Sequence, residues 1–77
     1  MAQEIRLPKL DMTMKQATIV AWLKKEGEAV RRGEPLLQVE TEKAVLEVES
    51  PADGVVSKIV AKEGSKVPVD SLIAILA

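Results

Sequence analysis

An internal repeat constrains the fold of this chain more than any other feature of its sequence. Residues 20–30 (VAWLKKEGEAV) align with residues 57–67 (SKIVAKEGSKV) at a shift of 37, which superposes the two Lys-Glu-Gly triplets. The same shift aligns Leu36 with Ile73. A pattern that recurs at a fixed spacing indicates a repeated structural unit. We therefore expect each half of the chain to contain a strand, a Lys-Glu-Gly turn and a second strand.

A helix over residues 17–32 is the competing prediction. Ile19, Trp22 and Leu23 follow helical spacing, but the second copy has Pro68 at the position of Arg31. Most apolar residues of the second copy are also β-branched, which favours strands. Four glycines and four prolines divide the chain into short Val-, Ile- and Leu-rich segments, which is typical of an all-β sandwich or barrel. We predict an all-β fold with pseudo-two-fold symmetry.

Residues 36–49 (LLQVETEKAVLEVE) have the alternation of a β-hairpin. A two-residue loop at Glu42 and Lys43 would pair position i with position 85 − i, so that Val39 faces Leu46. A slip of one residue would bring charge into the core, which fixes this register. Lys43 is therefore expected at the tip. Extended past residue 77, the repeat places the two termini together at the opposite end.

Composition excludes several classes of function. Eleven Lys and Arg against twelve Asp and Glu give a net charge of −1, whereas nucleic-acid binding needs a basic surface. The chain has no Cys and no His, so the common metal ligands and general bases are missing. We expect neither a metal site nor a catalytic site in this domain. Its apolar runs are too short for a signal peptide or a membrane span, which predicts a soluble intracellular domain.

Lys43 has two interpretations. The simpler is a solvated surface charge, since turns are polar and lysine is rarely buried. A protonated, exposed amine is also a poor nucleophile. A modifying enzyme could nevertheless acylate it, which would remove the charge and add a flexible arm to a rigid support. The alternating carboxylates nearby are best explained as a solvated outer face of the hairpin: Glu40, Glu42, Glu47 and Glu49.

Two further apolar features need an assignment. Trp22 is the only aromatic residue, and we expect it in the core with its indole N–H bonded to a partner. Met12 and Met14 lie in a segment with the turn residues Pro8 and Asp11. Because methionine is adaptable, these two side chains either fill gaps in the core or form a contact surface for a partner.

The sequence resembles the lipoyl domains of the acyltransferase (E2) components of 2-oxo acid dehydrogenase complexes. The resemblance covers nearly the whole chain. It rests on residues 7–14 (LPKLDMTM), 22–30 (WLKKEGEAV), 33–37 (GEPLL), 40–44 (ETEKA) and 48–54 (VESPADG). Two residues depart from the family pattern, since Asp11 stands where Gly is frequent and Glu42 where Asp is usual.

The resemblance implies a flattened β-barrel of two four-stranded antiparallel sheets, with lipoic acid in amide linkage on Lys43 between Glu42 and Ala44. A lipoate ligase would attach it. The dithiolane would take an acyl group from a thiamine-diphosphate decarboxylase (E1), pass it to coenzyme A at the E2 core and be reoxidised by a flavoprotein (E3). A chain without Cys or His needs an attached cofactor for such sulfur chemistry.

The resemblance is to the pyruvate or acetoin type of complex, in which the acyl group is acetyl. In such domains a loop near the modified lysine helps E1 recognition. The residues of this chain that the resemblance assigns to it are Leu10, Asp11, Met12, Thr13 and Met14.

Two alternatives remain open at this stage. A biotin carrier domain has the same fold and a tip lysine, but methionines are expected beside that lysine. An unmodified adaptor of the same fold would need no lysine there. We expect residues 1–77 to form one monomeric domain from the N-terminal part of a longer E2 chain, itself a dihydrolipoamide acyltransferase. Its expected location is the cytoplasm, or the mitochondrial matrix in a eukaryote.

Overall fold

The computed structural model describes residues 2–10 and 12–77, which form eight strands and no helix. None of the described residues therefore belongs to a helix that could cross a membrane. The strands are β1 (Gln3–Arg6), β2 (Gln16–Trp22), β3 (Ala29–Val30), β4 (Pro35–Glu40), β5 (Val45–Glu49), β6 (Gly54–Ile59), β7 (Lys66–Pro68) and β8 (Leu72–Leu76). The prediction of strands is confirmed, and the alternative helix over residues 17–32 is excluded because β2 and β3 occupy that segment.

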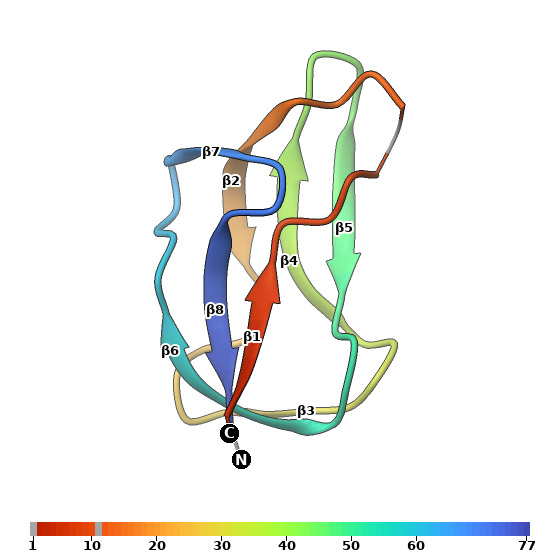
Figure 1. The fold of residues 1–77 in the computed structure, drawn as a ribbon. Helices are drawn as coiled ribbons and strands as arrows, with labels where there is room; N and C mark the ends of the chain where they lie inside the picture. Colours follow the sequence, from red (N-terminus) through yellow and green to blue (C-terminus); the bar gives the residue numbers. More distant parts are fainter. Residues whose placement is uncertain (1, 11) are drawn as a thin grey trace.

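The strands form two four-stranded antiparallel sheets, in the orders β1-β8-β6-β3 and β5-β4-β2-β7 (Figure 1). Advancing by 37 residues takes β2 to β6, β3 to β7 and β4 to β8. If β1 is taken as the equivalent of β5, this correspondence between strands relates the order of one sheet to the order of the other. The predicted pseudo-two-fold symmetry is confirmed. The molecule measures 32 × 21 × 17 Å along its principal axes, which agrees with a flattened barrel.

The two Lys-Glu-Gly turns connect the sheets through their glycines. The Gly27 N–H donates to the carbonyl oxygen of Val56, and the Gly64 N–H donates to that of Ile19, both at 2.7 Å. Their φ angles are +89° and +86°, a left-handed conformation that glycine adopts without steric cost. Each turn leaves a strand of one sheet and bonds to a strand of the other.

The glutamate before each of these glycines makes a second connection between the sheets. A carboxylate oxygen of Glu26 accepts the N–H of Ile59 at 2.8 Å, and one of Glu63 accepts the N–H of Trp22 at 3.1 Å. Ile59 and Trp22 are the last residues of β6 and β2. Each half of the repeat therefore supplies a hydrogen-bond acceptor for the backbone N–H at the end of a strand in the other half.

The core lies between the two sheets and consists of aliphatic side chains and one methionine. Its buried members are Ile5, Leu7, Met14, Ala17, Ile19, Val30, Leu36, Leu37, Val39, Val48, Val56, Ala61, Ile73, Ala74 and Leu76. Trp22 is half-buried and packs against this cluster. Its indole N–H donates to the carbonyl oxygen of Ala61 at 2.7 Å, which confirms the expected N–H partner, whereas the ring packs against the core without being buried in it.

The hairpin of β4 and β5 has the predicted register from Leu37 to Glu40, and at its base a register shift pairs Glu49 with Pro35 instead of Leu36. Leu37 pairs with Val48, and Val39 pairs with Leu46. The ends of the chain meet through β1 and β8, where Gln3 pairs with Leu76. Figure 1 shows the hairpin tip at one end of the molecule and both termini at the other, as the repeat predicts.

The equivalence of the two turns predicts equal effects of equal substitutions. Gly27→Ala and Gly64→Ala should each lower the free energy of unfolding by about 1 kcal/mol, because a Cβ makes the left-handed conformation costly. No atom lies within 4 Å of either added Cβ, so the effect is one of backbone conformation alone. Urea denaturation of both variants measures it. A difference of more than about 1 kcal/mol between them would show that the turns are not energetically equivalent.

Candidate functional site: the hairpin tip at Lys43

The loop between β4 and β5 consists of residues 41–44, with Glu42 and Lys43 at its tip. Glu40 pairs with Val45, and the Thr41 N–H then donates to the carbonyl oxygen of Ala44 at 2.9 Å. The Lys43 side chain is exposed. Among the described residues none forms an ion pair with it. Lys43 therefore lies at the tip of a paired hairpin with its amine open to solvent.

The side chain of Thr41 organises this loop. Its Oγ1 accepts the N–H of Lys43 and the N–H of Ala44, each at 3.2 Å, and donates to the carbonyl oxygen of Ala44 at 3.1 Å. The loop lacks the Asn-Gly or Asp-Gly pair that two-residue hairpin loops favour. The sequence prediction did not single out Thr41. The available signal was a hydroxyl residue directly before the loop, since Ser and Thr bond to the backbone two residues on.

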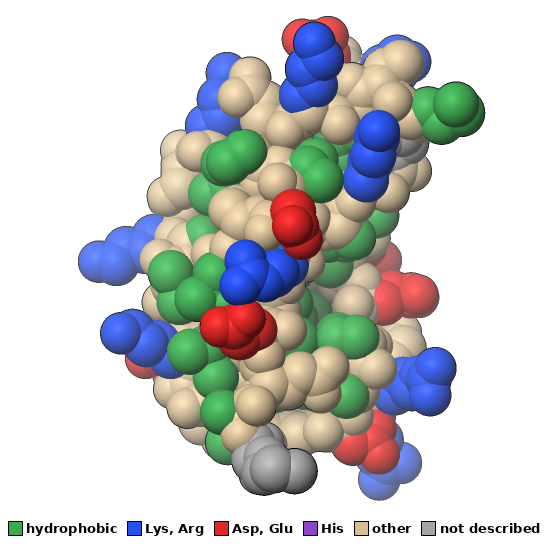
Figure 2. Space-filling model, viewed as in Figure 1, with side chains coloured by type: hydrophobic (Ala, Val, Ile, Leu, Met, Phe, Trp, Pro, Cys, Tyr) green, Lys and Arg blue, Asp and Glu red, His purple; other side chains and the backbone are tan. Residues whose placement is uncertain are grey.

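A groove of about 380 Å³ lies between this tip and the segment that leads into β2. Figure 1 shows that segment at the same end of the molecule as the tip. The groove is bordered by charged, polar and apolar side chains, among them Thr13, Met14, Lys15, Glu40, Lys43 and Lys66. Figure 2, drawn from the same side as Figure 1, shows positive and negative side chains interspersed over the face in view, without a continuous patch of one sign.

The loop predicted to meet a partner separates into exposed and buried residues. Met12 is 91% exposed and Leu10 is 37% exposed, whereas Met14 is 6% exposed and belongs to the core. Thr13 is exposed and lines the groove with Lys43. Asp11 lies outside the described residues. Met14 thus follows the packing alternative, and its assignment as a partner contact is corrected, because a buried thioether presents almost no surface to a partner.

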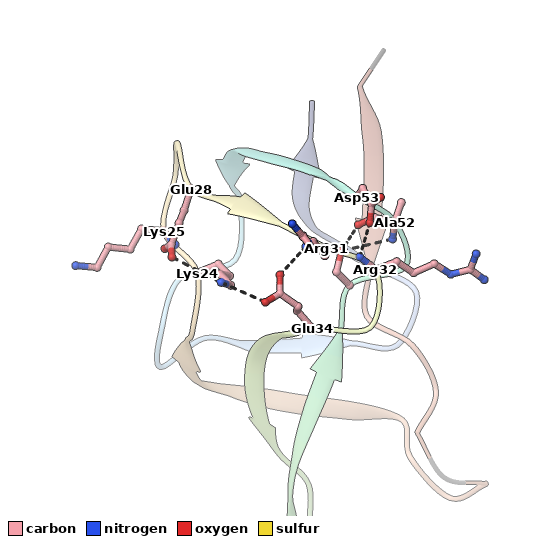
Figure 3. Close-up of polar contacts among 9 residues, drawn as sticks. Lys24, Lys25, Glu28, Arg31, Arg32, Glu34, Ala52 and Asp53 are labelled. Atoms are coloured by element: carbon pink, nitrogen blue, oxygen red, sulfur yellow. Dashed lines mark hydrogen bonds and ion pairs between the residues drawn. The ribbon is translucent and has the colours of Figure 1, made fainter.

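A charged cluster at the opposite end has a structural explanation (Figure 3). Lys24 Nζ lies 3.7 Å from a Glu28 carboxylate oxygen and 3.9 Å from one of Glu34. The other Glu34 oxygen accepts the Arg31 N–H, and an Asp53 oxygen accepts the N–H of Arg32, both at 2.7 Å. These carboxylates anchor turns. Across residues 2–10 and 12–77, no three acidic side chains are grouped so as to hold a metal ion.

Comparison with known proteins decides the family. Residues 3–76 match the biotin/lipoyl family, described as biotin-requiring enzyme. The solved lipoyl domain of the 2-oxoglutarate dehydrogenase complex from Azotobacter vinelandii is 39% identical, with a TM-score of 0.76 over 96% of this chain and 94% of that one. The chain belongs to the lipoyl domains. Lipoyl domains carry lipoic acid covalently attached to a lysine.

Two further relatives bear on this lipoyl domain. It is 47% identical over 75 residues to the dihydrolipoyllysine-residue acetyltransferase component of the pyruvate dehydrogenase complex from Rickettsia typhi, covering 96% of this chain and 19% of that protein. The lipoyl domain thus spans about a fifth of the length of that relative. The urea carboxylase of Kluyveromyces lactis has a TM-score of 0.83 at 21% identity, over 100% of this chain and 6% of that one, which shows a common fold alone.

The burial difference between the two methionines predicts opposite results in this lipoyl domain. Met14→Ala should lower the free energy of unfolding by about 2 to 4 kcal/mol, because it leaves a cavity in the core. Met12→Ala should change it by less than about 0.5 kcal/mol, since its side chain is solvated. Thermal and urea unfolding measure both. Equal stability of the two variants would contradict the burial of Met14.

Proposed function

We propose that Lys43 of this lipoyl domain bears lipoic acid in amide linkage, and that the domain carries acyl groups between active sites of a 2-oxo acid dehydrogenase complex. The observation that supports this most is the position of Lys43. It lies at the tip of the loop between β4 and β5, at the end opposite the paired termini. The amine is exposed on a chain whose family attaches lipoic acid to a lysine.

The chain's own contribution would be mechanical. It has no Cys and no His, so the attached dithiolane would supply the sulfur chemistry. Strands β4 and β5 hold the loop of Lys43 at one end of their sheet, and the arm would extend from there into solvent. Tethering at the far end keeps the arm at a high effective concentration near successive active sites, on the millimolar scale for short flexible linkers.

The similarity to the acetyltransferase component from Rickettsia typhi supports a complex of the pyruvate type. In this proposal the domain is part of a longer acyltransferase chain. It receives an acetyl group from E1, delivers it to coenzyme A at the E2 core and is reoxidised by E3. A lipoate ligase, drawing on ATP, attaches the cofactor to Lys43.

A biotin carrier function is disfavoured by two observations. Lys43 is flanked by Glu42 and Ala44 rather than by methionines. The solved lipoyl domain from Azotobacter vinelandii is 39% identical to this chain, whereas the carboxylase with the similar fold is only 21% identical. An unmodified adaptor role is an outcome that the following experiment can reveal.

Lipoylation should occur at Lys43 and at none of the other seven lysines. Incubation with a lipoate ligase, lipoate and ATP, followed by peptide mass spectrometry, locates the modification. Lys43→Gln should fold with unchanged stability and accept no lipoyl group, since Lys43 is exposed and forms no ion pair with a described residue. Modification of Lys15 or Lys66, or none in the wild type, would refute the assignment.

The exposed part of the segment before β2 should contribute to reductive acetylation by E1, the step that follows lipoylation. Met12→Ala should leave lipoylation unchanged but lower kcat/KM for reductive acetylation by a pyruvate E1 by roughly 5- to 30-fold, the effect of removing one interface side chain. Leu23→Ala is the matched control, because Leu23 is 40% exposed and follows the end of β2 that is remote from the tip. Full reductive acetylation of Met12→Ala would instead point to the polar hairpin face at Glu40 and Glu47.

A further inference from the structure

We infer that the hydroxyl of Thr41 is a positioning group for the lipoylation of Lys43, because it fixes the backbone that distinguishes Lys43 from the other lysines of the same groove. This inference rests on the proposed function and extends it. It names the feature of the domain by which a lipoate ligase selects one lysine.

Exposure and charge do not distinguish the candidate lysines. Lys15, Lys43 and Lys66 are all exposed, and all three line the groove beside the hairpin tip. Their backbones differ. Lys66 lies within the paired strand β7, and the carbonyl oxygen of Lys15 accepts the N–H of Val69 at 2.9 Å. Lys43 alone of these three lies in the loop that joins two paired strands, β4 and β5.

A single oxygen atom determines the shape of that loop. A hydroxyl offers one donor and two acceptor sites, and Thr41 Oγ1 uses all three. It accepts the N–H groups of Lys43 and Ala44 and donates to the Ala44 carbonyl. The same carbonyl accepts the Thr41 N–H. The threonine side chain thus connects the backbone of Lys43 to the last hydrogen-bonded residues of the hairpin, Thr41 and Ala44.

Loss of this oxygen should act locally. The N–H groups of Lys43 and Ala44 would then bond to water, and Glu42-Lys43 has little intrinsic preference for a two-residue turn. The loop would sample several conformations, while the strands below it would stay paired. Because these groups are exposed, their hydrogen bonds contribute little to global stability.

The modification itself requires a defined approach of the amine. Lys43 Nζ, after losing its extra proton, attacks the lipoyl carboxyl carbon that the ligase has activated with ATP. A C–N bond forms, the bond from that carbon to the phosphate oxygen breaks, AMP leaves, and the nitrogen releases a second proton. A ligase that holds the tip in one conformation would have to order a mobile loop first. The cost would fall on kcat/KM for the domain.

The test compares variants of Thr41 that keep or lack the side-chain hydroxyl. Thr41→Val keeps the β-branched shape without the hydroxyl, and Thr41→Ser keeps the hydroxyl. Ser57→Ala is the control, since Ser57 is an exposed hydroxyl residue in β6 of the other sheet and does not line the groove. We expect Thr41→Val to lower kcat/KM for lipoylation by roughly 5- to 20-fold, with Thr41→Ser and Ser57→Ala within about 2-fold of the wild type.

Two further measurements show whether the loss of kcat/KM in Thr41→Val arises from the position of the Lys43 backbone. Amide hydrogen exchange at Lys43 and Ala44 should accelerate in Thr41→Val and stay slow in Thr41→Ser. Acetylation of Lys43 by a small activated ester should proceed at the same rate in all variants, because the amine remains exposed. Slower chemical acetylation of Thr41→Val would overturn the inference, since the hydroxyl would then act on the amine itself.

The outcomes separate the two claims. Absence of lipoylation at Lys43 in the wild-type domain refutes the proposed function. Lipoylation of Thr41→Val at the wild-type rate refutes the positioning role and leaves the proposed function intact. A second variant without the hydroxyl, Thr41→Ala, must show the same loss as Thr41→Val, and full activity of either one overturns the inference.

Discussion

Hydrogen bonds from each Lys-Glu-Gly turn to the opposite sheet are the interactions on which the rest of this structure depends. Gly27 bonds to β6, and Gly64 bonds to β2, each at 2.7 Å. The preceding glutamates cap the ends of the same two strands. A chain of 77 residues has a small core, so directional bonds between the sheets are important for fixing their relative position. These hydrogen bonds join the two halves of the repeat, so neither half alone contains both the donors and the acceptors.

The position of Lys43 follows from this arrangement. β4 is a central strand that pairs with both β2 and β5, so the hairpin is held along its length. The loop that carries Lys43 begins directly above its last pair. Because β1 and β8 bring the termini together at the other end, the lysine is remote from both ends of the chain. One end of the molecule is thus suited to attachment and the other to presentation of the amine.

The segment before β2 shows how one short sequence can serve both packing and exposure. Met14 lies in the core, and its sulfur accepts the N–H of Leu10 at 3.3 Å. Met12, two residues earlier, is almost fully solvated. The buried methionine fixes its end of the segment to the barrel, and Thr13, between the two methionines, lines the groove with Lys43.

The sequence by itself determined the class of fold, the hairpin register and the lysine at its tip. Those features depend on the alternation of apolar and polar residues and on the internal repeat, and both can be recognised in the sequence without knowledge of the packing. The preference for strands over a helix at residues 17–32 came from the second copy, which could not be helical, and not from the first copy alone.

Only the tertiary structure decided which methionine is buried, which side chain shapes the loop and which lysines gather beside Lys43. The segment before β2 has no periodicity, so its burial depends on how it crosses the barrel. The role of Thr41 depends on the closed loop, since three polar groups converge on its oxygen only after the hairpin forms. Lys66 reaches the groove because β7 leaves its own half of the repeat and pairs with β2 in the other sheet. Contacts between residues far apart in sequence are set by the packing of the two sheets, and no local pattern encodes them.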